Sequence, residues 1–336
     1  MTNTHDIAHG GDLGAIIQAY PNAPTPWIDL STGISPWPYP YDSLPLDLTA
    51  LPSHADEQAC RESMAHYLGC APDTVTLMPG SQIGISLLPR VLPRSRIVIA
   101  GPTYEEHAHA WHSGGHDVIT LPLSDAITAQ ADVLVLVNPN NPDGTLVAQA
   151  ELERLRQRQA AKGGWLIIDE AFGDISPSTS FASHAGADGL IILRSFGKFF
   201  GLAGVRLGGI LSPHPLGRLI TQAIGPWAVS TQALRIGAAA YQDTVWIDRI
   251  RDQHKSRMHE LETLLRYAGL DLVGGTNLFC LAQHAHAPAL FTHLARVGLY
   301  VRRFEKHPTW LRFGLPADMT SLARLKQALS TFGDIE

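Results

Sequence analysis

Short apolar segments alternate with amphipathic ones over residues 55–210. Near-continuous runs of Val, Ile and Leu predict strands, and the segments between them predict helices. The expected strands are 74–78, 96–100, 118–121, 133–137, 165–169, 190–193 and 206–211. The expected helices are 55–68, 81–91, 103–113, 148–161 and 198–203. Apolar strands separated by helices indicate an α/β fold, with a mostly parallel central sheet covered by helices.

The pattern differs at both ends of the chain. Residues 1–50 are rich in Pro, Gly and aromatic residues, which predicts an ordered arm rather than a long helix. Beyond residue 213 an amphipathic segment comes before a mixture of further elements. That segment is 244–267, the strands are expected at 278–281, 300–304 and 310–313, and the helices at 286–297 and 317–331. We therefore expect an N-terminal arm at 1–50, a large domain at 51–213 and a small α+β domain at 214–336.

Composition narrows the class of protein. The 336 residues carry a net charge of −6, which argues against nucleic acid or an anionic membrane as the main partner. No apolar run approaches the roughly 20 residues of a spanning helix, and the N-terminus lacks the features of a secretory signal. The three cysteines are widely spaced and the histidines are scattered, so we expect a cytoplasmic protein without a metal site.

The segment after the expected strand 190–193 carries the most informative chemistry. Lys198 lies in a glycine-flanked turn, with Ser195 before it and Arg206 after it. A lysine there can form an imine with an aldehyde, while Ser195 and Arg206 hold an anion beside it. Pyridoxal 5'-phosphate needs that combination of a covalent tether and a phosphate site. The alternative is a pair of solvated cations near a strand end.

Other strand ends add compatible groups. Gly80 and Ser81 follow one strand and open a helix whose backbone N–H groups suit a phosphate, although a plain helix cap has the same pattern. Tyr104 could stack on a flat ring or be an ordinary core residue. Asn141 lies in a proline-rich turn that could present its amide to a ring hydroxyl or be a hairpin-like turn alone. Asp169 ends an apolar strand, where a carboxylate needs a cation such as a protonated pyridine nitrogen.

Together these residues resemble the fold-type-I family of pyridoxal-phosphate enzymes over nearly the whole chain. The resemblance implies that Lys198 binds the cofactor covalently and that Asp169 pairs with the pyridine nitrogen, as the two catalytic residues. It assigns the remaining cofactor contacts to Gly80, Ser81, Tyr104, Asn141, Ser195 and Arg206. Arg312, in Trp-Leu-Arg-Phe-Gly, matches the arginine that binds the substrate α-carboxylate. The family also implies a homodimer.

The N-terminal segment resembles a narrower group, the threonine-phosphate decarboxylases of cobalamin biosynthesis. The resemblance implies substrate contacts from His9, Gly10, Gly11, Thr32, Gly33, Asn141 and Arg302. The His-Gly-Gly element could form a nest for the substrate phosphate or be a plain turn. Arg302 resembles the arginine that contacts this phosphate, whereas Arg303 should point to the other face of a strand. Phe172 also resembles the decarboxylases, because aminotransferases usually carry a tyrosine there.

Two residues depart from the family pattern. Leu51 stands where many relatives have a tyrosine that reaches the cofactor of the neighbouring subunit, which puts that contact in doubt. Asp143 replaces the usual threonine of Asn-Pro-Thr-Gly and should change only turn chemistry.

The resemblance implies decarboxylation of L-threonine O-3-phosphate to (R)-1-amino-2-propanol O-2-phosphate. One alternative is an aminotransferase acting on histidinol phosphate, because the same side chains can serve either bond cleavage. Another is a non-catalytic pyridoxal-phosphate sensor domain, which the acidic charge argues against.

Overall fold

The computed structural model describes residues 10–44 and 48–332 and divides the chain into two compact units. The central unit is Pro38–Ile247, and the terminal unit combines Met1–Trp37 with Asp248–Glu336. These borders differ from the expected ones at residues 50 and 213. Helices α8 (His214–Ile224) and α9 (Thr231–Gln242), which the hydrophobic pattern did not predict, belong to the central unit, because α8 packs on its sheet and α9 packs on α2 (His54–Leu68).

Within residues 48–332 the central unit contains a seven-stranded sheet of order β2-β8-β7-β6-β5-β3-β4. Its strands are β2 (Val75–Met78), β3 (Arg96–Gly101), β4 (Asp117–Pro122), β5 (Val133–Val137), β6 (Trp165–Asp169), β7 (Leu190–Ser195) and β8 (Gly208–Leu211). Neighbouring strands from β4 to β7 pair in parallel, whereas β8 runs antiparallel to both β7 and β2. The predicted mostly parallel sheet is confirmed.

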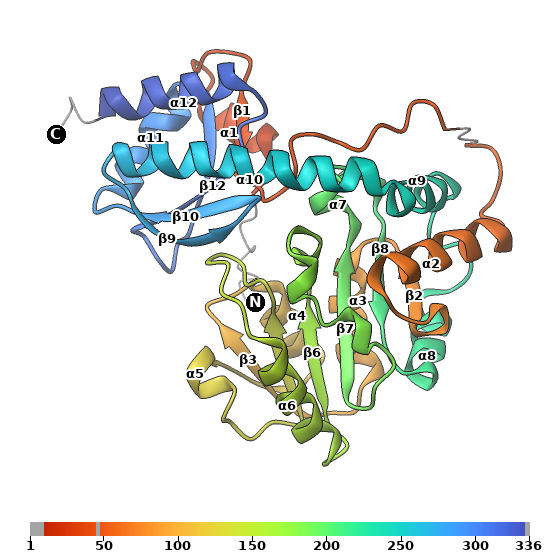
Figure 1. The fold of residues 1–336 in the computed structure, drawn as a ribbon. Coiled ribbons are helices and arrows are strands. Elements are labelled where there is room, and N and C mark those ends of the chain that lie inside the picture. Colours follow the sequence, from red (N-terminus) through yellow and green to blue (C-terminus); the bar gives the residue numbers. More distant parts are fainter. Residues whose placement is uncertain (1–9, 45–47, 333–336) are drawn as a thin grey trace. The chain divides into compact units, whose positions relative to one another are not determined.

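Helices cover both faces of this sheet (Figure 1). Besides α2, α8 and α9, they are α3 (Ser81–Val91), α4 (Glu106–Ser113), α5 (Leu123–Ala126), α6 (Gln149–Ala160) and α7 (Phe196–Phe199). One apolar cluster joins α3, α4 and α8 to a single sheet face through residues such as Ile85, Trp111 and Ile220. Helix α6 packs on β6 and contributes nothing to that cluster, so it covers the opposite face. Because the inner strands are buried on both sides, polar groups gather at their carboxyl ends.

The terminal unit is built on a second sheet. Among the described residues its strand order is β1-β11-β12-β10-β9. The strands are β1 (Ile28–Leu30), β9 (Asp271–Thr276), β10 (Phe279–Gln283), β11 (Leu299–Arg303) and β12 (Trp310–Gly314). The helices are α1 (Leu13–Ala19), α11 (Ala287–Arg296), α12 (Met319–Phe332) and α10 (Thr244–Tyr267), which contains the border between the units. The predicted strands and helices after residue 267 are confirmed, and β9 was missed.

The expected N-terminal arm is partly a strand of this second sheet. β1 pairs in parallel with β11, so residues from the two ends of the chain share one hydrogen-bonded ladder. The backbone after β1 also approaches β12 closely, because a Cβ atom on Gly314 would lie 2.2 Å from the carbonyl oxygen of Thr32. Only glycine permits that approach. Strand β1 is three residues long, which explains why its period-two pattern gave no signal.

Two further observations concern the whole described chain. No helix in residues 10–44 and 48–332 is long and apolar enough to cross a membrane. Cys60 and Cys280 are buried, Cys70 is half-buried, and none of the three forms a disulfide.

Candidate active site

Lys198 lies on the short helix α7, which follows directly from the buried strand β7 (Figure 1). Its side chain is half-buried, whereas the flanking Phe196, Phe199 and Phe200 are fully buried. The Phe196 and Phe200 rings stack with centroids 4.5 Å apart, and Phe200 stacks on Trp246 at 5.7 Å. These aromatic contacts fix α7 and therefore fix the position from which Lys198 projects.

The four residues predicted to hold a phosphate are brought together by the sheet. Ser195 at the end of β7 pairs with Gly208 of β8. A Cβ atom on Gly208 would lie 2.7 Å from the backbone nitrogen of Ser81, and one on Gly80 would lie 2.5 Å from Nη2 of Arg206. Both glycines are therefore needed for the helix start, the strand and the guanidinium to approach one another.

The chemistry of this cluster fits a phosphate monoester. Helix α3 has 11 residues, and its first backbone N–H groups lack intrahelical acceptors, so its start favours an anion. Arg206 adopts a left-handed conformation with φ 55°, and its Nη1 donates a hydrogen bond to the Ala203 carbonyl at 3.1 Å. The expectation that Arg206 begins strand β8 is wrong, because β8 starts at Gly208 and Arg206 lies in the turn before it.

Asp169 ends β6 and is 3% exposed. Its Oδ2 lies 2.9 Å from Nε2 of the buried His107, and its Oδ1 accepts the backbone N–H of Ala171 at 2.9 Å. One oxygen is thus fixed by the backbone and the other by an imidazole, so the carboxylate has a single orientation. His107 was not among the predicted site residues.

His107 is linked to another predicted residue, Tyr104. The Tyr104 carbonyl accepts the backbone N–H of His107, and the two rings pack edge to face at 6.2 Å. The Tyr104 hydroxyl also donates to Oε1 of Gln82 in α3 at 3.2 Å. No local pattern in the sequence signals the role of His107, because its contact with Asp169 joins α4 to β6.

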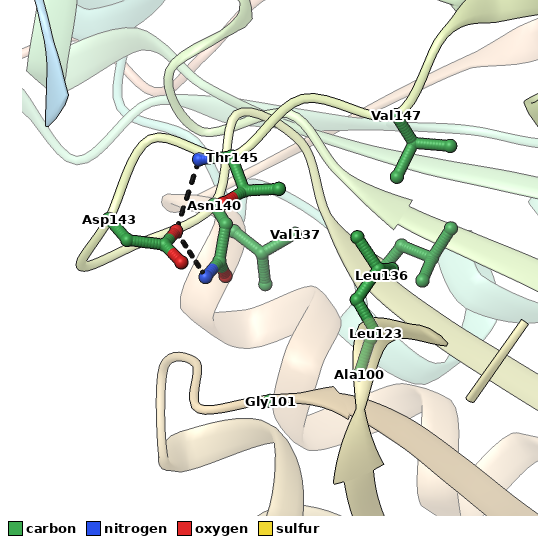
Figure 2. A pocket seen from close by; sticks show the side chains of 9 residues that line it. All are labelled: Ala100, Gly101, Leu123, Leu136, Val137, Asn140, Asp143, Thr145 and Val147. Atoms are coloured by element: carbon green, nitrogen blue, oxygen red, sulfur yellow. Dashed lines mark hydrogen bonds between the residues drawn. The ribbon is translucent and has the colours of Figure 1, made fainter. Parts of the chain in front are cut away.

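Asn141 lies in the turn after β5, as predicted, and is half-buried. The turn is held by its neighbours: Asn140 Nδ2 donates to Asp143 Oδ1 at 2.7 Å, and the same oxygen accepts the Thr145 N–H at 3.0 Å (Figure 2). Asn140 Oδ1 accepts the Thr103 hydroxyl at 2.7 Å, which ties this turn to the loop that carries Tyr104. The prediction that Asp143 serves turn chemistry is confirmed.

A small cleft adjoins this turn at the ends of β3 and β5 (Figure 2). It is lined by Ala100, Gly101, Leu123, Leu136, Val137, Asn140, Asp143, Thr145 and Val147. None of the predicted site residues lines it, and its polar members Asn140 and Asp143 bond to each other. We therefore do not place the chemistry in this cleft.

Glu170, the residue after Asp169, belongs to a separate buried network. Its Oε2 accepts a hydrogen bond from Nη1 of Arg194 at 2.7 Å, and Nη2 of Arg194 donates to Asp174. Burial alone would lower the pKa of Arg194, but Asp174 and Glu170 more than offset it and raise that pKa. Phe172 is buried in the segment between the two carboxylates. This network fixes the backbone that follows Asp169.

The predicted arginines lie on neighbouring strands of the terminal unit. Arg302 of β11 and Arg312 of β12 are direct partners in an antiparallel pair, so their side chains share one face. Arg303 points to the other face, as predicted, and its guanidinium lies 5.0 Å from the ring centroid of Phe291. Burial, and then the charge of Arg302, lowers the pKa of Arg312 to about 10. Two like charges held side by side favour a ligand with two anionic groups.

Among the remaining predicted substrate residues, Gly10 and Gly11 contact Ser31, which in turn contacts Arg312. His9 is outside the described residues. Gly11 donates its backbone N–H to the hydroxyl of Ser31 at 2.7 Å, and a Cβ atom on Gly10 would lie 2.4 Å from the Ser31 carbonyl oxygen. That carbonyl accepts a hydrogen bond from Arg312 at 2.9 Å. Thr32 and Gly33 follow directly. Ser31, which the sequence analysis did not single out, therefore joins the Gly10-Gly11 loop to Arg312.

Leu51, where a tyrosine was expected from relatives, is 66% exposed. In residues 10–44 and 48–332, no three His, Cys, Asp or Glu side chains are grouped so that they could hold a metal ion.

Comparison with known proteins identifies the family. Residues 50–332 match the class I and II aminotransferases. The chain belongs to that family. It is 40% identical to a threonine-phosphate decarboxylase of a Sinorhizobium species, with 96% of this chain and 98% of the relative covered. A threonine-phosphate decarboxylase of Pseudomonas aeruginosa is 39% identical, with 97% and 98% covered. A histidinol-phosphate aminotransferase of Granulibacter bethesdensis is more distant, at 28% identity with 77% and 73% covered.

Solved structures agree on the fold of this aminotransferase-family chain. The histidinol-phosphate aminotransferase of Sinorhizobium meliloti in complex with pyridoxal-5'-phosphate has a TM-score of 0.82 at 18% identity, with 97% of this chain and 96% of that chain covered. The L-threonine-O-3-phosphate decarboxylase of Porphyromonas gingivalis has a TM-score of 0.77 at 20% identity, with 91% and 99% covered. The predicted fold class, a pyridoxal-phosphate-dependent transferase fold of type I, is therefore confirmed.

Proposed function

We propose that this chain decarboxylates L-threonine O-3-phosphate to (R)-1-amino-2-propanol O-2-phosphate with pyridoxal 5'-phosphate as cofactor, a step of cobalamin biosynthesis. The observation that carries the proposal is the similarity, over nearly the full length, to two threonine-phosphate decarboxylases. The opposed pair Arg302 and Arg312 supports the same class of substrate, because a phosphorylated amino acid has two anionic groups.

The residues of the central unit are suited to the cofactor. Gly80, Ser81, Ser195 and Arg206 form a positively polarised cluster that would hold its phosphate. Asp169, oriented by His107, would hold negative charge beside the pyridine nitrogen, and the Nζ atom of Lys198 would be the point of covalent attachment. Tyr104 and Asn141 would contact the ring. When bound, the cofactor supplies a ring that accepts the electron pair left by the departing carboxylate.

The residues of the terminal unit are suited to the substrate. Arg312 would bind the α-carboxylate, and Arg302 with Gly10 and Gly11 would bind the phosphate. Two anchored ends restrict rotation of the substrate and thereby select which bond to Cα is broken. After CO₂ leaves, Nζ of Lys198 is the group that we assign to return a proton to Cα. His9, Thr32 and Gly33 complete the proposed substrate contacts.

We also propose that the protein acts as a cytoplasmic homodimer. Leu48, Leu51 and Trp227 are exposed apolar side chains of the central unit, and Trp227 adopts a left-handed conformation with φ 57°. Thr231 at the start of α9 donates a hydrogen bond to the Ala50 carbonyl at 3.1 Å, which brings the segment of Leu51 close to that of Trp227. Exposed apolar groups gathered in this way favour association. Sedimentation of the wild type and of Leu51→Asp tests this, and a monomeric wild type would refute it.

Incubation of the purified enzyme with L-threonine O-3-phosphate tests the reaction. We expect release of CO₂ that does not depend on 2-oxoglutarate. Amino transfer to 2-oxoglutarate without CO₂ release, from either threonine phosphate or histidinol phosphate, would refute decarboxylation and favour an aminotransferase.

A further inference from the structure

Ser31 follows strand β1 and is 0% exposed, yet it makes polar contacts with several parts of the terminal unit, among them a side-chain hydrogen bond with Tyr300 of β11. Its backbone N–H and its hydroxyl both donate to Oδ1 of Asp29, at 2.8 and 2.6 Å. Its Oγ accepts the backbone N–H of Gly11 at 2.7 Å, and its carbonyl oxygen accepts a hydrogen bond from Nη2 of Arg312 at 2.9 Å. A single buried residue thus bonds to the glycine loop, to β1 and to β12.

The direction of these bonds follows from the chemistry of a hydroxyl. Ser31 has one hydroxyl hydrogen, and the Asp29 carboxylate takes it. The lone pairs of Oγ then accept the N–H of Gly11, so Asp29 sets the polarity of the contact with the loop. The loop also lies directly on the Ser31 backbone, since a Cβ atom on Gly10 would be 2.4 Å from the carbonyl oxygen. Ser31 therefore fixes the position of Gly10 and Gly11.

The same residue fixes the arginine at the other end of the proposed substrate. The Arg312 guanidinium is held by the Ser31 carbonyl on one side and lies 5.1 Å from the ring centroid of Phe279. Because Arg302 is the direct strand partner of Arg312, the position of its backbone also depends on that of Arg312. The hydroxyl of Ser31 contacts the glycine loop, whereas its backbone carbonyl contacts Arg312. Mutation of the side chain can therefore remove the first contact and keep the second.

We propose that Ser31 is a positioning residue for substrate specificity: its hydroxyl, polarised by Asp29, holds the Gly10-Gly11 loop in register with Arg312, so that the enzyme prefers a phosphorylated amino acid over the same amino acid without phosphate. This inference rests on the proposed function, which assigns the loop to the substrate phosphate and Arg312 to the carboxylate. Ser31 itself touches neither the reacting atoms nor the cofactor.

The test compares Ser31→Ala with the wild-type holoenzyme. The dissociation constants of L-threonine O-3-phosphate and of L-threonine are measured by the change of cofactor absorbance on binding, and KM and kcat by CO₂ release. We expect Ser31→Ala to weaken binding of the phosphorylated amino acid and raise its KM by about five- to tenfold, the effect of losing the hydrogen bond that holds the glycine loop. Affinity for L-threonine and kcat should stay within about twofold, because the carbonyl that holds Arg312 remains. An equal loss for both ligands would overturn the proposal.

Ser35→Ala is the matched control. Ser35 is also buried and lies in the same segment, but its Oγ contacts Nε2 of His254 at 2.8 Å and donates to the Trp37 carbonyl at 3.1 Å. Its loss should lower stability without changing the preference for the phosphorylated ligand. If Ser35→Ala changes this preference as Ser31→Ala does, the effect is general loosening and the proposal is wrong.

Two variants of Asp29 give a test that does not depend on the folding of Ser31→Ala. Asp29→Asn keeps an oxygen that can accept from Ser31 and should keep the preference, whereas Asp29→Ala should lose it as Ser31→Ala does. Equal behaviour of the two variants would contradict the proposal. If the wild type itself shows no preference for threonine phosphate, the proposed function fails as well. If the wild type shows the preference and both Ser31→Ala and Asp29→Ala retain it, only the role of Ser31 is refuted.

Discussion

The central and terminal units arrange the charged side chains of their candidate sites differently. In the central unit each buried charge described above has a partner of complementary character: Arg194 lies between Glu170 and Asp174, and Asp169 contacts His107. In the terminal unit the buried Arg312 and the half-buried Arg302 lie opposite each other on adjacent strands, and the carboxylate of Asp29 offsets only part of the effect of burial and of Arg302 on the pKa of Arg312. Like charges opposite each other on neighbouring strands are destabilising. An anionic ligand bound between them would turn this repulsion into a net attraction. The paired charges of the central unit stabilise a rigid scaffold. The two neighbouring arginines of the terminal unit favour binding of a ligand with two anionic groups.

The two units also differ in how their site residues are spread along the chain. In the central unit each candidate residue lies at or just beyond a strand end, within a short and recognisable stretch. In the terminal unit the candidate residues come from distant parts of the chain. Ser31 and Arg312, which share a hydrogen bond, are 281 residues apart. Local patterns can therefore indicate the first group, whereas Gly11, Arg302 and Arg312 were predicted by family resemblance and the link through Ser31 is seen only in the structure.

Loss of Lys198 gives the largest expected effect and tests the central unit first. Lys198→Ala removes the amine that we assign to covalent attachment and proton return, so turnover should fall by at least about three orders of magnitude. The yellow absorbance of the lysine-bound cofactor should disappear, while the urea midpoint stays close to that of the wild type because the side chain is only half-buried. Turnover near the wild-type level would disprove the assignment.

The sequence predicted much of the central unit and less of the terminal one, for physical reasons. Asp169 and Asn141 could be assigned because a buried parallel strand leaves its last residues at one edge of the sheet. His107 was missed because its role depends on contact between α4 and β6, which no local pattern encodes. Arg206 was expected in a strand, since nothing in its neighbourhood signals a left-handed non-glycine residue. Arg302 and Arg312 were found by family resemblance alone.

The next largest effect concerns the stability of the central unit. Arg194→Met leaves Glu170 and Asp174 buried without their cation, which should lower the free energy of unfolding by about 3–5 kcal/mol. The urea midpoint, followed by circular dichroism, measures this. Arg154→Met is the control, because Arg154 pairs with Glu151 at the surface of α6 and its loss should leave the midpoint nearly unchanged. Similar midpoints for the two variants would contradict the contrast between the units.

A smaller effect, on the KM of the substrate, is expected for substitution of arginines on the two faces of β11. Arg302→Gln removes one member of the opposed pair, so we expect the KM for L-threonine O-3-phosphate to rise by roughly ten- to a hundredfold, as for the loss of a charged hydrogen bond. Arg303→Gln is the neighbouring control, since Arg303 packs on Phe291 at the opposite face. If Arg303→Gln raises KM as much as Arg302→Gln does, Arg302 does not contact the substrate phosphate.

The smallest expected effect is on the pH dependence of stability and concerns one buried histidine in each unit. His107 contacts a carboxylate, whereas His254 contacts the Ser35 hydroxyl at 2.8 Å and stacks on Trp37 at 5.6 Å. Burial lowers the pKa of His254 to about 4, below its ordinary value of 6.5. The unfolded chain therefore binds more protons than the folded chain between these two pH values, so stability is lost as the pH falls through this window.

Between pH 7 and pH 5.5 this histidine alone should lower the free energy of unfolding by about 1 kcal/mol. Urea unfolding at both pH values measures the difference, and His254→Gln should reduce the pH dependence by that amount. His259→Gln, at an exposed position of the same helix, should leave it unchanged. If His254→Gln keeps the wild-type pH dependence, the pKa of His254 is the same in the folded and unfolded chain, and burial does not lower it.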